Sequence, residues 1–368
     1  MKDDNAENAS RWIAGVEPPE DVRALSMAAI FEKECREQPE RLAALLRSYS
    51  LDDGIRQKLR VLQVLRESPG PVLLLGMGAS LCSSVSGTVL LQSSGRSSFF
   101  ADAGEWLHYG LPVWNEVGGT VLVTTSGESA ELVELCRKHP DKPLVLICNN
   151  ERSTCWRLAK VRFPILAGPE YGNATKTFTN ATAACIILAF ELLRRDWQAA
   201  AKQVMSCYSS ILDRVFNMRS ELREFCAGAA NIELVGRGPG YGSAFMGALC
   251  IREMTGHRAA SHTGAGFRHG PLLDVNESHV SIIFALGRAA DLGFKLAQDC
   301  SARGGKVVLV SGDAHTPAPK LLPVRIEAVP EPWESVTSIL VPQALTLALI
   351  EKHGANLKPR FHYGAMYE

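Results

Sequence analysis

Two side chains of this sequence, Glu253 and His269, have the chemistry of a proton-transfer pair. Glu253 falls in a run of helical character, and His269 follows sixteen residues later in a glycine-rich loop. A carboxylate and an imidazole can move a proton between neighbouring carbons and can assist the opening of a sugar ring. Each residue also has an ordinary alternative, because helix glutamates are usually solvated and loop histidines often serve only as caps. The spacing alone leaves the pair as a hypothesis.

A hydroxyl-rich segment, Thr124-Thr-Ser-Gly-Glu-Ser129, has the composition of an anion-binding loop. It follows an apolar run typical of a strand and precedes a helical run that begins at Ala130. Hydroxyls and backbone N–H groups at a helix start bind anions, because the helix dipole adds positive potential there. The alternative is a serine or threonine helix cap that binds nothing. Ser80 follows an earlier strand-like run, so we expect it at the same edge of a parallel sheet, which favours a binding site.

Short apolar runs alternate with helical runs along the chain, and this pattern predicts parallel sheets covered by helices on both faces. Strands are expected at 71–78, 117–125 and 144–148, and a helix at 130–138. Similar runs recur about 160 residues later, at 232–238, 280–284 and 306–310. His108 even stands in register with His269. The ordered recurrence indicates an internal duplication, so we predict an α/β fold class with two domains of one fold.

The expected domain boundaries follow from this pattern. An N-terminal arm and helices cover residues 1–66, and Pro39 suits the first turn of a new helix there. The first α/β domain covers residues 67–205 and the second covers residues 206–345. Residues 346–368 end in an irregular aromatic tail, which we expect to fold over the site.

The composition disfavours several function classes. The 368 residues include 39 basic and 39 acidic side chains, so we expect no nucleic-acid partner and no attraction to a membrane surface. No apolar stretch has the length of a membrane span, and the polar N-terminus does not resemble a signal peptide. Ten cysteines without C-x-x-C spacing are typical of reduced thiols, which favours a cytoplasmic location.

Neither a cofactor nor a metal is expected. Gly76-Met-Gly78 and Gly236-Arg-Gly238 are incomplete dinucleotide-binding patterns, since Leu81 and Tyr241 stand where a third glycine belongs. A nucleotide-dependent oxidoreductase is therefore disfavoured. Three histidines from His257 to His269 are separated by five and seven residues, and these gaps match no standard metal site.

Taken together, these segments resemble the double sugar isomerase (SIS) domain family over nearly the whole chain, from about residue 31. The segments similar to family motifs are Glu32-Lys-Glu-Cys-Arg-Glu-Gln-Pro39, Thr124-Thr-Ser-Gly-Glu-Ser129, Glu170-Tyr-Gly-Asn-Ala-Thr-Lys176, the helix with Glu253, and His269-Gly-Pro271. The pattern is similar to the isomerase half of glucosamine-6-phosphate synthase. Gly266-Phe-Arg-His-Gly-Pro271 is more similar to the galactosamine-6-phosphate deaminase/isomerase branch.

The resemblance implies two tandem three-layer αβα domains with N-terminal helices, and it implies a role for each matched residue. Glu253 would move a proton between C1 and C2 through an enediol or enolamine, and His269 would assist ring opening. The histidine of this family often reaches the site from a neighbouring subunit, so a homodimer with shared active sites is implied. The residues expected to bind the sugar phosphate are Ser80, Thr124, Thr125, Ser126, Ser129 and Thr175.

We therefore expect a phosphosugar isomerase or deaminase that acts on a hexose 6-phosphate, with an amino or amine-substituted sugar as substrate. Only a short polar arm precedes the helices, so glutamine-dependent synthesis is not expected. Gly266 also stands where the synthase has a glutamate, which argues in the same direction. Two alternatives stay open: a fructosamine-6-phosphate deglycase, and a non-catalytic sugar-phosphate sensor.

Overall fold

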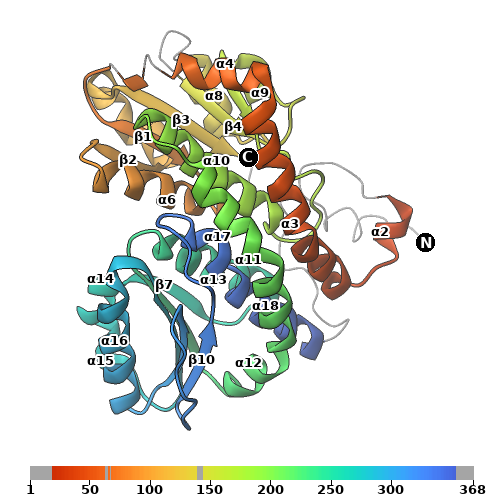
Figure 1. Cartoon of the computed structure of the whole chain (residues 1–368), viewed down its shortest axis with the longest axis vertical. Coiled ribbons are helices and arrows are strands. Elements are labelled where there is room, and N and C mark those ends of the chain that lie inside the picture. Colours follow the sequence, from red (N-terminus) through yellow and green to blue (C-terminus); the bar gives the residue numbers. More distant parts are fainter. Residues whose placement is uncertain (1–18, 63–64, 67, 139–143, 354–368) are drawn as a thin grey trace. The chain divides into compact units, whose positions relative to one another are not determined.

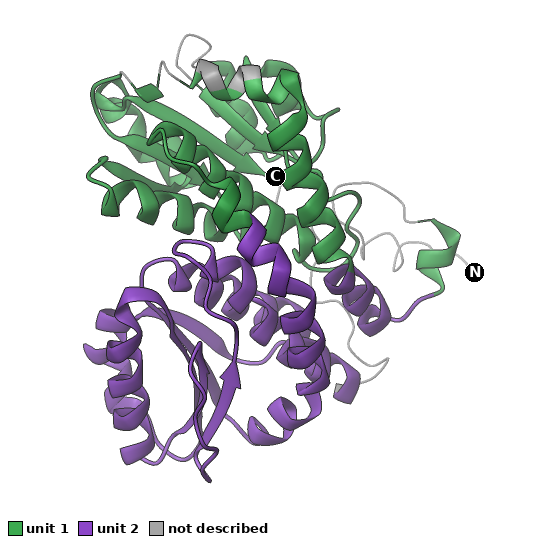
Figure 2. Ribbon diagram, viewed as in Figure 1, with its two compact units in different colours: residues 1–24, 37–201, 361–368 green, residues 25–36, 202–360 purple. Residues whose placement is uncertain are grey.

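The structure, a computed structural model, describes residues 19–62, 65–66, 68–138 and 144–353. Within it the chain divides into two compact units. Unit 1 contains residues 19–24 and 37–201, and unit 2 contains residues 25–36 and 202–353 (Figure 2). The expected N-terminal arm before residue 19 and the expected aromatic tail after residue 353 lie outside the described residues.

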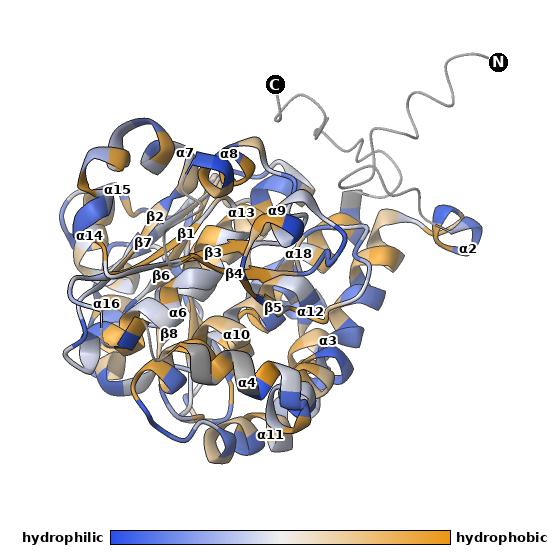
Figure 3. Cartoon of the chain, turned by 90° about the horizontal axis from the view of Figure 1, so that it is seen from above, coloured by the Kyte–Doolittle hydropathy of each residue, from blue (hydrophilic) through white to orange (hydrophobic). Residues whose placement is uncertain are grey.

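Unit 1 is built on a five-stranded parallel sheet with the order β2-β1-β3-β4-β5. The strands are β1 (Val72–Gly76), β2 (Ser98–Asp102), β3 (Gly119–Thr124), β4 (Leu144–Cys148) and β5 (Val161–Pro164). Every residue of β1, β3 and β4 is buried, which explains why these strands are continuous apolar runs in the sequence. The hydropathy colours show β3 and β4 as hydrophobic (Figure 3).

Helices cover both faces of this sheet. The principal ones are α6 (Ala79–Ser93), α8 (Ala130–Lys138), α9 (Thr154–Leu158) and α10 (Lys176–Leu192). Leu73 and Leu75 of β1 share a buried cluster with Leu132 and Leu135 of α8. Right-handed crossovers that leave β1 and β3 in opposite directions place α6 and α8 on opposite faces. The shorter elements are α2 (Glu20–Arg23), α4 (Asp53–Val61), α7 (Ala103–Glu105), η2 (Trp106–Gly110) and η3 (Leu111–Glu116).

Unit 2 repeats the strand order of unit 1. Its parallel sheet has the order β10-β9-β8-β6-β7, which read from the other edge is the same path through the sheet. The strands are β6 (Asn231–Gly236), β7 (Ala259–Thr263), β8 (His279–Ala285), β9 (Lys306–Ser311) and β10 (Leu321–Arg325). His108 lies in η2 after β2, and His269 lies just after α14, which follows β7, so the two histidines occupy corresponding connections.

The helices of unit 2 form two groups, one on each side of its sheet (Figure 1). One group is α14 (Gly264–Arg268), α15 (Pro271–Asp274) and α16 (Ala290–Ala302), the last preceded by η4 (Gly287–Ala289). The other group includes α12 (Arg219–Phe225), α13 (Gly240–Thr255), α17 (Glu334–Ser338) and α18 (Leu340–His353). Helix α11 (Gln198–Asn217) leads into this unit.

The predicted α/β fold class is confirmed, since each unit has a parallel sheet with helices on both faces. The prediction for Pro39 was wrong. Pro39 lies inside the continuous helix α3 (Met27–Leu51) and does not begin a new one. Proline removes one helical hydrogen bond, but Phe31 and Leu42 are fully buried on either side of it, and this burial stabilises the unbroken helix.

Candidate functional site

The sheet of unit 1 has a topological switch point between β1 and β3. These neighbouring strands send their helices, α6 and α8, to opposite faces, and open α/β sheets bind ligands at the carboxyl ends of two such strands. Ser80 stands in the first turn of α6 after β1. Thr124 ends β3, and residues 125–129 form the loop between β3 and α8. The topology therefore brings these hydroxyl groups to the edge where open α/β sheets bind ligands.

The loop after β3 is organised by its own hydroxyl oxygens. The backbone N–H of Gly127 donates to Oγ1 of Thr124 over 3.1 Å, and the N–H of Glu128 donates to Oγ of Ser126 over 3.2 Å. Each hydroxyl accepts in these bonds, so each keeps its own O–H proton to donate. Thr124 and Ser126 can therefore shape the loop and still donate to an anion.

The first residues of α9 hold this segment in place. The N–H of Cys155 donates to the carbonyl of Gly127 over 3.0 Å, and the N–H of Thr154 donates to Oε1 of Glu128 over 2.9 Å. Gly127 has φ +67°, and a Cβ added there would lie 2.1 Å from Oγ of Ser153. Only glycine fits this turn, and the close contact fixes the backbone of the loop.

Three further hydroxyls at this edge have no hydrogen-bond partner among the described residues: those of Ser80, Thr125 and Ser129. The carbonyl of Ser129 accepts from the N–H of Val133 over 3.0 Å, so Ser129 is the N-cap residue directly before α8. Ser129 is 9% exposed, and Ser80 and Thr125 are half-buried. Hydroxyl donors at the start of a nine-residue helix can bind a negatively charged group.

Thr175 has a different environment. Its hydroxyl donates to Oε1 of Glu170 over 2.8 Å, and its N–H donates to the same oxygen over 2.9 Å. Thr177 donates its N–H and its hydroxyl to the same carboxylate. Burial raises the pKa of Glu170. The hydrogen bonds from Thr175 and Thr177 lower it, but the effect of burial is larger. Thr175 is fully buried, so its hydroxyl supports the start of α10 and is not one of the open hydroxyls.

Glu253 is half-buried near the end of α13, two residues before the last helical residue, Thr255. Helix α13 covers the sheet face of Leu234, because a Cβ added at Gly247 would lie 2.7 Å from the Leu234 side chain. The chain then turns through only three residues into β7. Glu253 therefore lies close to the amino-terminal end of β7, about 20 Å along the helix from Gly240.

His269 lies on the other side of this sheet. It is the C-cap residue of α14, and Phe267 of that helix packs in one cluster with Val235. Val235 directly follows Leu234 in β6. Successive residues of a strand point to opposite faces, so α13 and α14 cover opposite faces. The imidazole of His269 is exposed and forms no hydrogen bond or ion pair with a described residue. The structure does not pair Glu253 with His269 within one chain.

Unit 2 contains ionisable residues, Glu233 and Glu334, that the sequence did not predict as site residues. Nε2 of His262 lies 2.8 Å from Oε2 of Glu233, on neighbouring strands. Burial, with a contribution from Glu331, raises the pKa of Glu334 to about 8. Both glutamates are ordinary helix or strand residues by local pattern, so no sequence signal marked them. Among the residues that the structure describes, no group of three or more His, Cys, Asp or Glu side chains could hold a metal ion.

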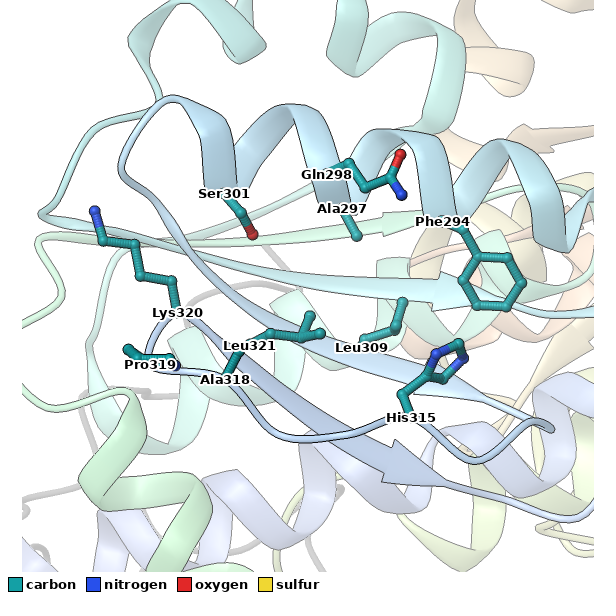
Figure 4. Close-up of a pocket in the computed structure, with 10 residues that line it drawn as sticks. All are labelled: Phe294, Ala297, Gln298, Ser301, Leu309, His315, Ala318, Pro319, Lys320 and Leu321. Atoms are coloured by element: carbon teal, nitrogen blue, oxygen red, sulfur yellow. The ribbon is translucent and has the colours of Figure 1, made fainter.

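A cavity of about 530 Å³ lies between α16 and the strands β9 and β10 (Figure 4). Phe294 and His315 stand at one end of it, with ring centroids 4.9 Å apart, and Lys320 stands at the other. Its walls are mostly carbon, which suits no phosphate group. All of its lining residues belong to unit 2.

The chain is similar to known proteins in both sequence and fold. Residues 226–352 match the family model of the SIS domain. The chain contains a SIS domain. Over 341 residues it is 28% identical to a glutamine–fructose-6-phosphate aminotransferase (isomerizing) of Bartonella henselae, covering 88% of this chain and 55% of that protein. A second such protein, from Bartonella quintana, is 28% identical over 62% of this chain and 39% of its own length. This chain thus spans about half or less of the length of these curated relatives.

Solved structures share the fold of both units of this chain. The C-terminal domain of glucosamine-fructose-6-phosphate aminotransferase from Francisella tularensis has a TM-score of 0.77 at 22% identity, covering 91% of this chain and 98% of that one. The tagatose-6-phosphate ketose/aldose isomerase of Escherichia coli has a TM-score of 0.74 at 19% identity, covering 93% and 97%. The predicted resemblance to the double SIS family is confirmed. No described helix has the length and apolar character needed to cross a membrane.

Proposed function

We propose that this SIS protein is a phosphosugar aldose–ketose isomerase or an amino-sugar-6-phosphate deaminase, acting on a hexose 6-phosphate. One observation carries the proposal: hydroxyl groups with protons to donate converge on the β1/β3 switch point, at the start of α8. A phosphate dianion suits such a set of donors, because charge-assisted hydrogen bonds and the helix dipole act together. Two relatives are named for fructose 6-phosphate and tagatose 6-phosphate, and these names support a sugar phosphate as the ligand.

In this proposal the hydroxyl groups of the loop after β3 bind the phosphate, and Glu253 and His269 act on the sugar. Ser80, Thr124, Thr125, Ser126 and Ser129 would donate hydrogen bonds to the phosphate, while Thr175 positions α10 through Glu170. A carboxylate can remove a proton from C2 of the open-chain sugar and return it to C1 through an enediol or enolamine. Glu253 is our candidate for this base. His269 would assist ring opening by donating a proton to the ring oxygen, as the anomeric hydroxyl loses its own proton.

The two candidate residues lie on opposite faces of one sheet, so we also propose a homodimer in which His269 of one chain serves the site of its partner. Closed two-fold dimers are the commonest protein assemblies, and each interface residue occurs twice in them. The balanced charge of the chain supports a small-molecule substrate, not a nucleic acid or a membrane surface. The ten cysteines without C-x-x-C spacing support a cytoplasmic setting.

The test is a turnover assay with the purified chain. Glucosamine 6-phosphate, galactosamine 6-phosphate and fructosyl-amino-acid 6-phosphates are offered, and ketose phosphate, aldose phosphate and released amine are measured. We expect turnover of at least one substrate and its loss in Glu253→Gln. Glu221→Gln, an exposed glutamate on α12, is the matched control and should retain turnover. Full turnover in Glu253→Gln would refute the assigned role.

A sugar-phosphate sensor is the second candidate, because the open hydroxyls suffice for binding while Glu253 and His269 are not paired within one chain. A sensor would bind these sugar phosphates, with a rise in melting temperature, and would release no product. Release of an amino acid from the fructosyl substrates would instead identify a deglycase.

A further inference from the structure

Unit 2 has a switch point of its own, because its sheet repeats the strand order of unit 1. The equivalent strands are β6 and β8, whose helices α13 and α16 cover opposite faces. The loop after β8 therefore corresponds to the anion-binding loop after β3. Both loops turn on a left-handed glycine, Gly127 with φ +67° in unit 1 and Gly287 with φ +58° in unit 2.

The carboxylate of Glu331 occupies the switch point of unit 2. Its Oε1 accepts from the backbone N–H of Arg288 over 2.7 Å, and its Oε2 accepts from Nε of the same residue over 2.6 Å. Arg288 belongs to η4, which leads directly into α16. Glu331 thus makes the contacts that a bound oxyanion makes at a helix start: a backbone N–H, a guanidinium and the helix dipole.

A second carboxyl group, that of Glu334, also lies beside Gly287. A Cβ added at Gly287 would lie 2.2 Å from Oε1 of Glu331 and 2.7 Å from Oε1 of Glu334, so both carboxyl groups converge on this glycine. Glu334 is 4% exposed, and its Oε2 has no hydrogen-bond partner among the described residues. Because burial raises the pKa of Glu334 to about 8, the group is largely protonated at neutral pH and can donate to an anion.

Unit 1 differs at the corresponding place. In unit 1 the carboxylate after the last strand belongs to Glu170. Glu170 accepts from the N–H groups at the start of α10 and does not approach Gly127. The neighbours of Gly127 are instead Ser153 and Cys148. The hydroxyls of Thr125 and Ser129 therefore stay open in unit 1, whereas in unit 2 the N–H of Arg288 is already bonded to Glu331.

We propose that unit 2 contains a second oxyanion-binding site, formed by the start of η4–α16, Arg288 and Glu334, and that the carboxylate of Glu331 fills it. The ligand class is a tetrahedral or planar oxyanion such as phosphate or a carboxylate. In the native chain the side chain of Glu331 closes this site, so it takes no external anion. The inference on unit 2 does not depend on the proposed function of unit 1.

The experiment is a titration of the full chain with inorganic phosphate, followed by calorimetry and by thermal unfolding. Glu331→Ala should bind one more phosphate per chain than the wild type, and phosphate should raise its melting temperature more. The same comparison is made on a Ser126→Ala/Ser129→Ala background, which weakens the site of unit 1. The additional site should persist there, so a failure of the unit 1 proposal is distinguishable from a failure of this one.

Glu331→Gln is the matched control, because its amide still fills the site and still accepts from Arg288. It should gain no phosphate site. If Glu331→Ala does not fold in the absence of phosphate, Glu331→Ser is titrated in its place. The proposal is overturned if phosphate binding and melting temperature respond equally in wild type and in the Ala or Ser variant, or if Glu331→Gln gains the same site.

Discussion

Glu253 and His269 lie on opposite faces of the second sheet, although only sixteen residues separate them in the sequence. Helix α13 carries Glu253 over the face of Leu234, and α14 carries His269 over the face of Val235. Two residues held on opposite sides of one sheet can act on one substrate when each comes from a different copy of the chain. The proposed dimer can therefore be tested through these two residues.

Mixed dimers provide that test. Glu253→Gln and His269→Asn should each be inactive alone. If the two variants are unfolded and refolded together, random pairing makes about half of the dimers mixed, and each mixed dimer has one intact site. We expect activity to return to about a quarter of the wild-type value in the turnover assay. No recovery, with dimers demonstrated by sedimentation, would contradict shared sites.

The hydroxyls of the loop after β3 should control substrate affinity. Removing one charge-assisted hydrogen bond costs about 1.5–3 kcal/mol, which corresponds to at least about tenfold weaker binding. We expect Ser126→Ala and Ser129→Ala each to raise the dissociation constant for the phosphosugar by that factor, measured by calorimetry. Ser93→Ala is the control, since the Ser93 hydroxyl donates to the carbonyl of Leu90 within α6. Equal affinity in all three variants would place the phosphate elsewhere.

Glu170 should be a stability residue of unit 1. Its carboxylate accepts the N–H groups and hydroxyls of Thr175 and Thr177, and Glu170→Ala leaves four donors without their partner. We expect a loss of about 2–4 kcal/mol in the free energy of unfolding, measured by urea denaturation. Glu128→Ala removes one bond at an exposed site, to the N–H of Thr154, and should cost less than about 1 kcal/mol. Similar losses in both variants would show that the Glu170 contacts contribute little.

Glu334 should make the protein less stable as the pH rises. Burial raises its pKa from an ordinary 4.5 to about 8, so the folded chain retains a proton that the unfolded chain has lost between these values. The free energy of unfolding should therefore fall as pH rises from about 4.5 to about 8, by up to about 1.4 kcal/mol per pH unit from this group. Glu334→Gln should remove that slope in denaturation series at several pH values. An unchanged slope would mean that Glu334 ionises normally.

The sequence predicted the central strands and the anion-binding loop because their signals are local. Strands β1, β3 and β4 are buried on both sides, so they are unbroken apolar runs, and the glycine and hydroxyls of the loop directly follow one of them. The outer strands were not predicted. β2 contains Ser98 and Asp102, and β10 contains Pro323 and Arg325, because an edge strand pairs on one side only and tolerates such residues.

The sequence by itself determined the fold class, the recurrence of its central strands and the residue types available for chemistry, since these follow from composition and from patterns within a few residues. Only the tertiary structure decided which of those residues meet. It joins the Thr175 hydroxyl to Glu170, separates Glu253 from His269 across a sheet, and brings Glu331 to Arg288 from 43 residues away. The physical reason is that hydrogen bonds and sheet faces depend on the path of the chain in space, and no local pattern records that path.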